Sequence, residues 1–245
     1  MNGQVLRVHP KVLNLCEILE QNGLHQQKTE VQSLINYLGE TEKRLSVMTE
    51  ELRELKSEVN KLENQSVRTK CREIVSEANE KVQQAKNLLT SMKKKFLSSA
   101  EKLVETFRQK GRDALVQGIH ILRIPSAIAR LGQFFSHVAE SMKESAKRLD
   151  AVQEELHQAG TYATDAPLDK STQKTDALES DHRLFAQARN SIESCGKSFA
   201  EMEQNVNHLA RQFQLEKPSV KSQLSEWKSK RIKLRTISSA KEQAR

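Results

Sequence analysis

The chain has few of the residues that build sheets, tight turns and disulfide frameworks. Its 245 residues include only four prolines, eight glycines and three cysteines, and aromatic residues make up 4% of it. Sheet-rich folds need frequent turns and bulky strand residues, so this composition disfavours them. The cysteines, Cys16, Cys71 and Cys195, lie far apart and match no disulfide or metal-ligand spacing. We interpret them as small apolar residues on helical faces.

The chain also lacks the long apolar runs of membrane proteins. Its least polar stretch, residues 119–135, is interrupted by Arg123, Pro125 and Arg130. This stretch is shorter than the ~20 residues that a membrane-spanning helix needs. Residues 1–10 have neither the basic region nor the apolar region of a secretory signal. We therefore expect a cytoplasmic protein.

No group of residues has the spacing of a known catalytic or metal-binding motif. The seven histidines are scattered, and none belongs to a zinc-binding pattern. Gly111 and Gly118 are isolated, so they form no phosphate-binding loop, and no nucleophile elbow is present. We expect a protein that is not an enzyme, with no catalytic, cofactor-binding or metal-binding residues and no small-molecule substrate.

Apolar heptad repeats are the main feature that the chain does have. The clearest lies in residues 178–213, where a second apolar set, Ala188, Cys195, Met202 and Leu209, fills the 3,4 spacing and only Asp181 breaks it. Such a repeat forms one apolar seam along a helix, and the seam needs a partner because it is otherwise left in water. We predict a helix interface formed by the residues that recur every seven positions: Leu178, Phe185, Ile192, Phe199, Val206 and Phe213.

Two further heptad seams lie in residues 31–62 and 128–156, with Thr41 and Ser145 as the polar exceptions. Between them the period changes to eleven. One set is Val67, Ala78, Leu89, Ala100, Gly111 and Leu122, and the other is Ile74, Ala85, Phe96, Phe107 and Gly118. An eleven-residue period favours a straight or slightly right-handed helix. We predict one helix over 67–122, ended by Pro125, with a bend or a change of supercoil near Asn64. No proline or glycine there stops the helix from running through.

These patterns together predict an all-α protein. Its long amphipathic helices form an elongated helical bundle or coiled coil, followed by a polar, basic C-terminal tail. A short helix in residues 1–23 opens at Pro10 and ends at Asn22-Gly23. A heptad helix follows in 24–64, and the eleven-residue helix in 65–124. Residues 126–216 form an antiparallel hairpin, in which Gly160 closes the first helix and 160–175 is the loop.

The charge is concentrated at the C-terminal end of the sequence. The net charge is +8, and residues 217–245 alone contain nine Lys or Arg and two Glu. Two interpretations remain open for this tail. It is a solvated, disordered segment, or it is a basic arm that binds a polyanion by neutralising phosphates, with Trp227 stacking on a base. The predicted polyanion-binding residues are Lys228, Lys230, Arg231, Lys233 and Arg235.

Short segments, most of them at the ends of the predicted helices, form a recognisable series: His9-Pro10, Asn22-Gly23-Leu24, Ile124-Pro125-Ser126, Ser136-His137 and Glu216-Lys217-Pro218-Ser219-Val220-Lys221. In this series the chain resembles an uncharacterised, all-helical domain family encoded on bacterial mobile and conjugative elements. The resemblance implies a bacterial cytoplasm and horizontally transferred DNA, and it carries no activity or site residue.

We therefore expect a non-enzymatic scaffold or adaptor that acts through coiled-coil contacts, accessory to a mobile genetic element in the context that the resemblance implies. Its expected partners are a second copy of the chain or another helical protein. One alternative is nonspecific binding of nucleic acid or another polyanion by the tail. A second alternative is binding to a membrane surface through the 67–122 helix. This is disfavoured because Ala, Gly and Ser dilute its apolar face.

Overall fold

The computed structural model describes residues 6–62, 65–118, 122, 124–163 and 171–215, and every regular element within these ranges is helical. A 3-10 helix, η1 (Leu6–Val8), precedes α1 (Pro10–Gln21) and α2 (His25–Val59). They are followed by α3 (Gln65–Lys110), α4 (Arg112–Gly118), α5 (Ile124–Ala163) and α6 (Ser171–Leu215). The all-α helical bundle predicted from the sequence is confirmed.

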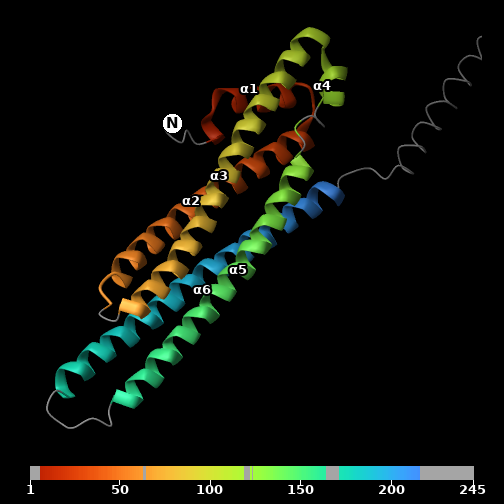
Figure 1. Ribbon diagram of the computed structural model, residues 1–245. Helices are drawn as coiled ribbons and strands as arrows, with labels where there is room; N and C mark the ends of the chain where they lie inside the picture. Colours follow the sequence, from red (N-terminus) through yellow and green to blue (C-terminus); the bar gives the residue numbers. More distant parts are fainter. Residues whose placement is uncertain (1–5, 63–64, 119–121, 123, 164–170, 216–245) are drawn as a thin grey trace, which may run out of the picture.

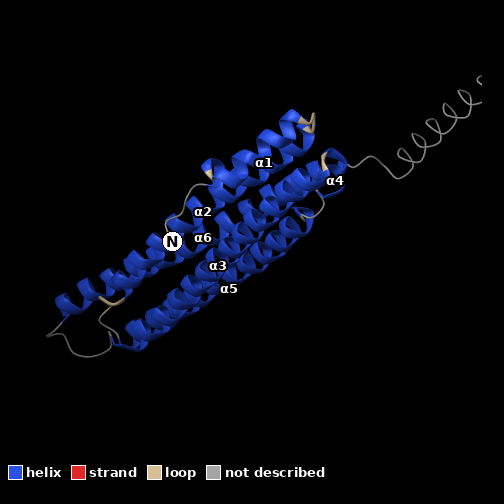
Figure 2. Cartoon of the chain, turned by 90° about the horizontal axis from the view of Figure 1, so that it is seen from above, coloured by secondary structure: helices blue, strands red, loops and turns tan. Residues whose placement is uncertain are grey.

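Four long helices run side by side and form the bundle (Figures 1 and 2). Each packs against two neighbours, in the cyclic order α2, α3, α5, α6 and back to α2. Neighbouring helices run in opposite directions, so the topology is up-down-up-down. Helix α1 packs against α2 and α3. It lies with α4 at the end of the bundle where α2 and α5 begin and α3 and α6 end.

Polar contacts between α2 and α3 repeat every seven residues. The Glu42 carboxylate lies 2.5 Å from the Lys93 ammonium group. Seven residues further along α2, Thr49 accepts a hydrogen bond of 3.2 Å from Lys86, which lies seven residues back along α3. Equal steps in opposite directions define an antiparallel pair with a constant heptad register.

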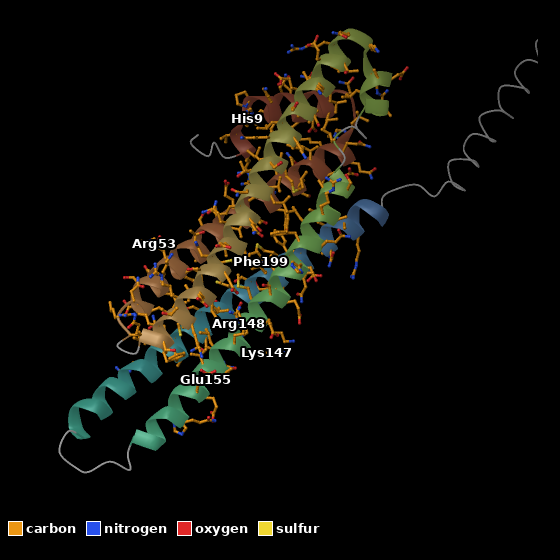
Figure 3. The ribbon with its side chains drawn as sticks, in the orientation of Figure 1. His9, Arg53, Lys147, Arg148, Glu155 and Phe199 are labelled. Carbon is orange, nitrogen blue, oxygen red and sulfur yellow. The ribbon has the colours of Figure 1, made fainter. Side chains whose placement is uncertain are left out.

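The pair formed by α3 and α5 has the same register. Glu77 lies 2.5 Å from the guanidinium group of Arg148, and seven residues away on each helix Lys70 pairs with Glu155. Figure 3 shows Arg148 and Glu155 along α5. Such exposed ion pairs contribute only about 0–1 kcal/mol each, so they mark the register more than they stabilise it.

The heptad seams lie in the interior of the bundle. Polar Thr41 and Ser145 are also buried, at 1% and 5% exposure, because they occupy seam positions. The eleven-residue stripe of α3 is buried from Val67 to Ala100. On the same helix the side chain of Lys93 is only 13% exposed, and its ammonium group reaches Glu42. The largest fully buried side chains include Phe135, Phe185, Phe199, Leu15, Leu19, Leu38, Leu45, Leu52 and Leu103.

Local sequence signals explain how α1 begins and ends. His9 caps its first turn by accepting a hydrogen bond from the backbone N–H of Lys11, and Pro10 is the first helical residue. At the other end Gly23 has a φ of +69°. Its N–H donates to the Glu20 carbonyl, and the N–H of Leu24 donates to the Leu19 carbonyl, which is the Schellman arrangement.

Three details of the predicted helix boundaries differ in the structure. The chain reverses between α2 and α3 instead of running through near Asn64, because α2 ends at Val59 and α3 packs back against it. The predicted 67–122 helix is interrupted at Gly111, whose φ of +75° is incompatible with a continuous helix. Helix α5 runs through Gly160 to Ala163, since a single glycine costs only about 1 kcal/mol within a helix, and α6 begins at Ser171, so the predicted 160–175 loop is shorter at both ends.

The two helices of the C-terminal hairpin, α5 and α6, approach closely at two glycines. A methyl group at Gly132 would lie 3.0 Å from Cγ1 of Val206, and one at Gly196 would lie 3.2 Å from Cβ of Met142. Between these points the rings of Phe135 and Phe199 pack with centroids 5.8 Å apart. Glycine thus allows these backbones to come together around a central aromatic pair.

Candidate functional site

The residues predicted to form a helix interface lie on α6 and face the interior of the bundle. Phe185, Ile192, Phe199 and Val206 are at most 2% exposed, and Phe199 can be followed in Figure 3. The side chains of Leu178 and Phe213 lie outside the described part. Across the bundle, the hydroxyl of Tyr37 on α2 donates a 2.8 Å hydrogen bond to the backbone carbonyl of Met202 on α6. This surface is occupied within one chain.

The residues predicted to bind a polyanion, Lys228, Lys230, Arg231, Lys233 and Arg235, lie outside the described residues, as does Trp227. What the structure does place is the end of α6 at Leu215. It lies at the same end of the bundle as α1, α4 and the start of α5 (Figure 1). The basic C-terminal segment therefore follows directly from this end.

The charge of the bundle itself is distributed unevenly along its length. Residues 86–142, which include the end of α3, α4 and the beginning of α5, contain ten Lys or Arg and four acidic residues. Residues 143–193, toward the opposite end of the bundle, contain seven Lys or Arg and ten acidic residues. Residues 45–85, also toward that end, contain seven Lys or Arg and eight acidic residues. The end of the bundle that precedes the tail is thus its basic end.

Most cations that the structure describes at the basic end have no acidic partner. Lys93 pairs with Glu42, and Lys11 lies 2.6 Å from Glu101. Within the described residues, no ion pair is formed by the following exposed side chains: Lys94, Lys95, Lys102, Arg108, Lys110, Arg112 and Arg130. Sequence reasoning missed this surface. The triple lysine at 93–95 was a local signal, but the clustering depends on how the helices fold back.

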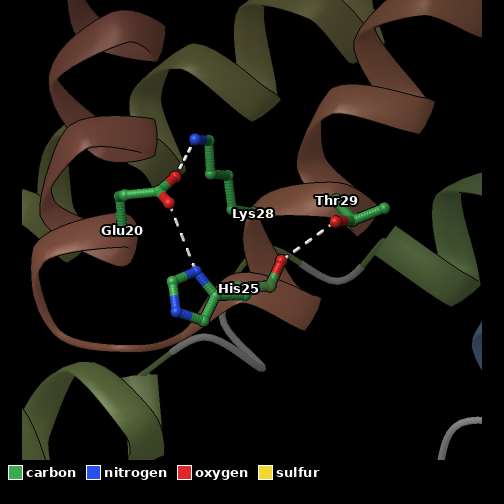
Figure 4. Close-up of polar contacts among 4 residues, drawn as sticks. All are labelled: Glu20, His25, Lys28 and Thr29. Carbon is green, nitrogen blue, oxygen red and sulfur yellow. Dashed lines mark hydrogen bonds and ion pairs between the residues drawn. The ribbon is translucent and has the colours of Figure 1, made fainter.

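Four polar side chains are joined by contacts at the turn between α1 and α2, near this end of the bundle (Figure 4). Glu20 pairs with Lys28, and its Oε1 lies 3.3 Å from Nδ1 of His25. Thr29 donates a 3.0 Å hydrogen bond to the His25 carbonyl. His25 is 70% exposed, so its contact with Glu20 is open to water and joins the two helices. We interpret the group as structural.

The thiols have the environment of core residues. Cys71 and Cys195 are buried and Cys16 is half-buried. Burial raises the pKa of Cys195 to about 12, and burial also raises the pKa of Cys16. Since the thiolate is the reactive form, neither environment activates a nucleophile. Over the described ranges no three metal-ligating side chains come together, and no helix there is apolar enough over a sufficient length to cross a membrane.

Fold and surface together define a helical bundle protein with one basic end. The chain belongs to a family of unknown function, DUF6674, which matches residues 9–245 and so includes the basic C-terminal segment. No curated protein and no solved structure matches the chain.

Proposed function

We propose that this protein is a non-catalytic helical adaptor that binds a polyanion at the basic end of its bundle, nucleic acid being the leading class. The observation that supports it most is the coincidence of two basic features. The excess of Lys and Arg in residues 86–142 lies at the end of the bundle from which the basic tail follows. Adjacent fixed and tail cations contact more phosphates than either set alone.

The bundle suits this role because it holds its cations on a rigid frame. The described seam residues of all four long helices are buried within one chain, so the surface side chains project from packed helices. Cations without acidic partners keep their charge available for phosphate groups. Contacts of this kind give affinity without sequence readout.

We propose that protein partners bind to the outer surface of the bundle. An adaptor contact with a second copy or another helical protein does not need the heptad seams, because these already face one another inside the bundle. In the setting of a mobile element, which the resemblance suggests, we propose that the polyanion is DNA and that the protein partner belongs to the transfer machinery.

Binding is tested by fluorescence anisotropy with labelled single-stranded and duplex DNA of about 20 nucleotides, between 50 and 200 mM salt. We expect affinity to fall by roughly 10-fold or more over this range, as for several phosphate contacts. One variant replaces by Gln the tail cations Lys228, Lys230, Arg231, Lys233 and Arg235. A second replaces Lys94, Arg108, Lys110 and Arg112, and a matched control at the opposite end replaces Arg72, Lys81, Lys143 and Arg183.

We expect both basic-end variants to weaken binding and the control to leave it unchanged. Equal loss in the control variant would show a general charge effect, and absence of binding at low salt would refute the proposal. Flotation with anionic liposomes tests the membrane alternative, which requires the buried stripe of α3 to leave the bundle. Light scattering over a range of concentrations tests self-association, and a strict monomer would reject it.

A further inference from the structure

A cavity of about 500 Å³ opens between α2, α3 and the beginning of α5. Its floor is apolar and includes Leu38 from α2, Met92 and Phe96 from α3, and Leu122. Leu38, Phe96 and Leu122 are at most 6% exposed, so the floor is continuous with the core of the bundle. The volume lies within the range of small-molecule sites, about 300–1,000 Å³.

The rim of this cavity is cationic. Lys95 and Lys102 from α3 and Arg130 from α5 line it, all three are exposed, and no Asp or Glu is among the lining residues. Their neighbour Lys93 has an acidic partner in Glu42, whereas these three form no ion pair within the described residues. An apolar floor beneath unneutralised cations is complementary to a ligand with an apolar chain and one anionic head.

We propose that the cavity binds a free amphipathic anion, of which a long-chain carboxylate is the type. The apolar chain would lie on Met92, Phe96 and Leu122, where apolar surface of both the ligand and the cavity floor is removed from water. The carboxylate would lie among Lys95, Lys102 and Arg130, where guanidinium and ammonium groups donate to it. A nucleic acid strand has no apolar chain for the floor, so the two ligands share cations of the basic end and differ in their use of the floor.

The proposal is tested with the full-length protein and dansyl-labelled undecanoic acid as the fluorescent probe. Competitors are dodecanoate, dodecanol and hexanoate, each below its aggregation limit. We expect dodecanoate to displace the probe. The affinity for hexanoate should be lower by 100-fold or more, because each buried methylene raises the affinity about fourfold. Dodecanol, which has the chain without the charge, should be weaker by about tenfold.

Two variants separate the rim from the floor. Replacing Lys95, Lys102 and Arg130 together by Gln should weaken dodecanoate by roughly 10-fold or more and leave dodecanol unchanged, as expected for several surface charges. Ser98→Trp, at an exposed lining position, should obstruct both ligands without removing charge. The matched control replaces Lys94, Arg108 and Lys110, which are exposed and lie outside the lining.

The outcomes are distinct from those for nucleic acid. The variant in which the five tail cations are replaced by Gln should bind dodecanoate with the same affinity as the unchanged protein, whatever its affinity for DNA. Circular dichroism melting shows that each variant is folded. Failure of dodecanoate to displace the probe would overturn the proposal, as would equal loss of affinity in the control variant. Binding to anionic phospholipid vesicles without displacement of the probe would assign the cations to a membrane surface and would also overturn it.

Discussion

Three glycines inside long helices allow the packing of the bundle to be tested with one chemical change, the addition of a methyl group. Apart from the backbone of its own helix and its chain neighbours, Gly39 in α2 has no atom within 4 Å of the position that a Cβ would take. At such a site Ala favours the helix over Gly by about 1 kcal/mol. Gly39→Ala should therefore raise the free energy of unfolding by about 1 kcal/mol, or the melting temperature by ~2–4 °C for a chain of this size.

The same substitution at Gly132 should have the opposite result. The new methyl group would lie 3.0 Å from Cγ1 of Val206 and 3.3 Å from Oδ1 of Asn207. Val206 is fully buried and β-branched, so it cannot rotate away. Overpacking costs about 1–3 kcal/mol. The gain in helix propensity of about 1 kcal/mol offsets part of this cost, so Gly132→Ala should lower the free energy of unfolding by about 0–2 kcal/mol. Gly196→Ala should lie between the two, because Met142 Cβ is 3.2 Å away.

Urea unfolding followed by circular dichroism gives the three free energies, and the order is the decisive result. We expect Gly39→Ala to be the most stable, Gly196→Ala intermediate and Gly132→Ala the least stable. If Gly132→Ala stabilised the protein as much as Gly39→Ala, helices α5 and α6 would not approach as closely as described here, and the pairing of their seams would have to be revised.

The remaining predictions concern the core, a helix cap and the response to pH. Phe199→Ala should lower the free energy of unfolding by about 3–5 kcal/mol, because the ring is fully buried, and an unchanged urea midpoint would contradict this. Gly23→Ala should cost about 1 kcal/mol or more, measured in the same assay, since its φ of +69° disfavours any residue with a Cβ. The raised pKa of Cys195 predicts full stability below pH 9 and a decline as pH rises from 9 toward about 12, because the unfolded chain loses that proton first. When the free energy of unfolding is measured over this pH range, it should fall more steeply with pH for the unchanged protein than for Cys195→Ala.

The sequence predicts the buried face of each long helix and an antiparallel hairpin over 126–216, but it does not show how the other helices pack around that hairpin. The heptad positions are interior, including polar Thr41, because a period of 3.5 residues is a local property of the chain. The reversal after Val59 was missed because neither proline nor glycine marks it, so the packing of α3 against α2 is what reveals it. The eleven-residue repeat includes Gly111 as a position of one helix, because a repeat contains no information on its φ. The tail cations were visible in composition, whereas the basic end of the bundle required the topology.

The constant heptad register between neighbouring helices limits how the length of this protein can change. Deleting one residue within α2 turns every later side chain by about 100° and moves it along the axis by about 1.5 Å, so Leu52 and Leu55 would leave the interior together. The contact between Thr49 and Lys86 would be lost in the same step. A block of seven residues added to or removed from both members of an antiparallel pair restores the alignment, because it returns each side chain to the same face. We expect members of this family to differ in length mainly at the connections and the ends of the helices, and inside them by paired blocks that keep the same face buried.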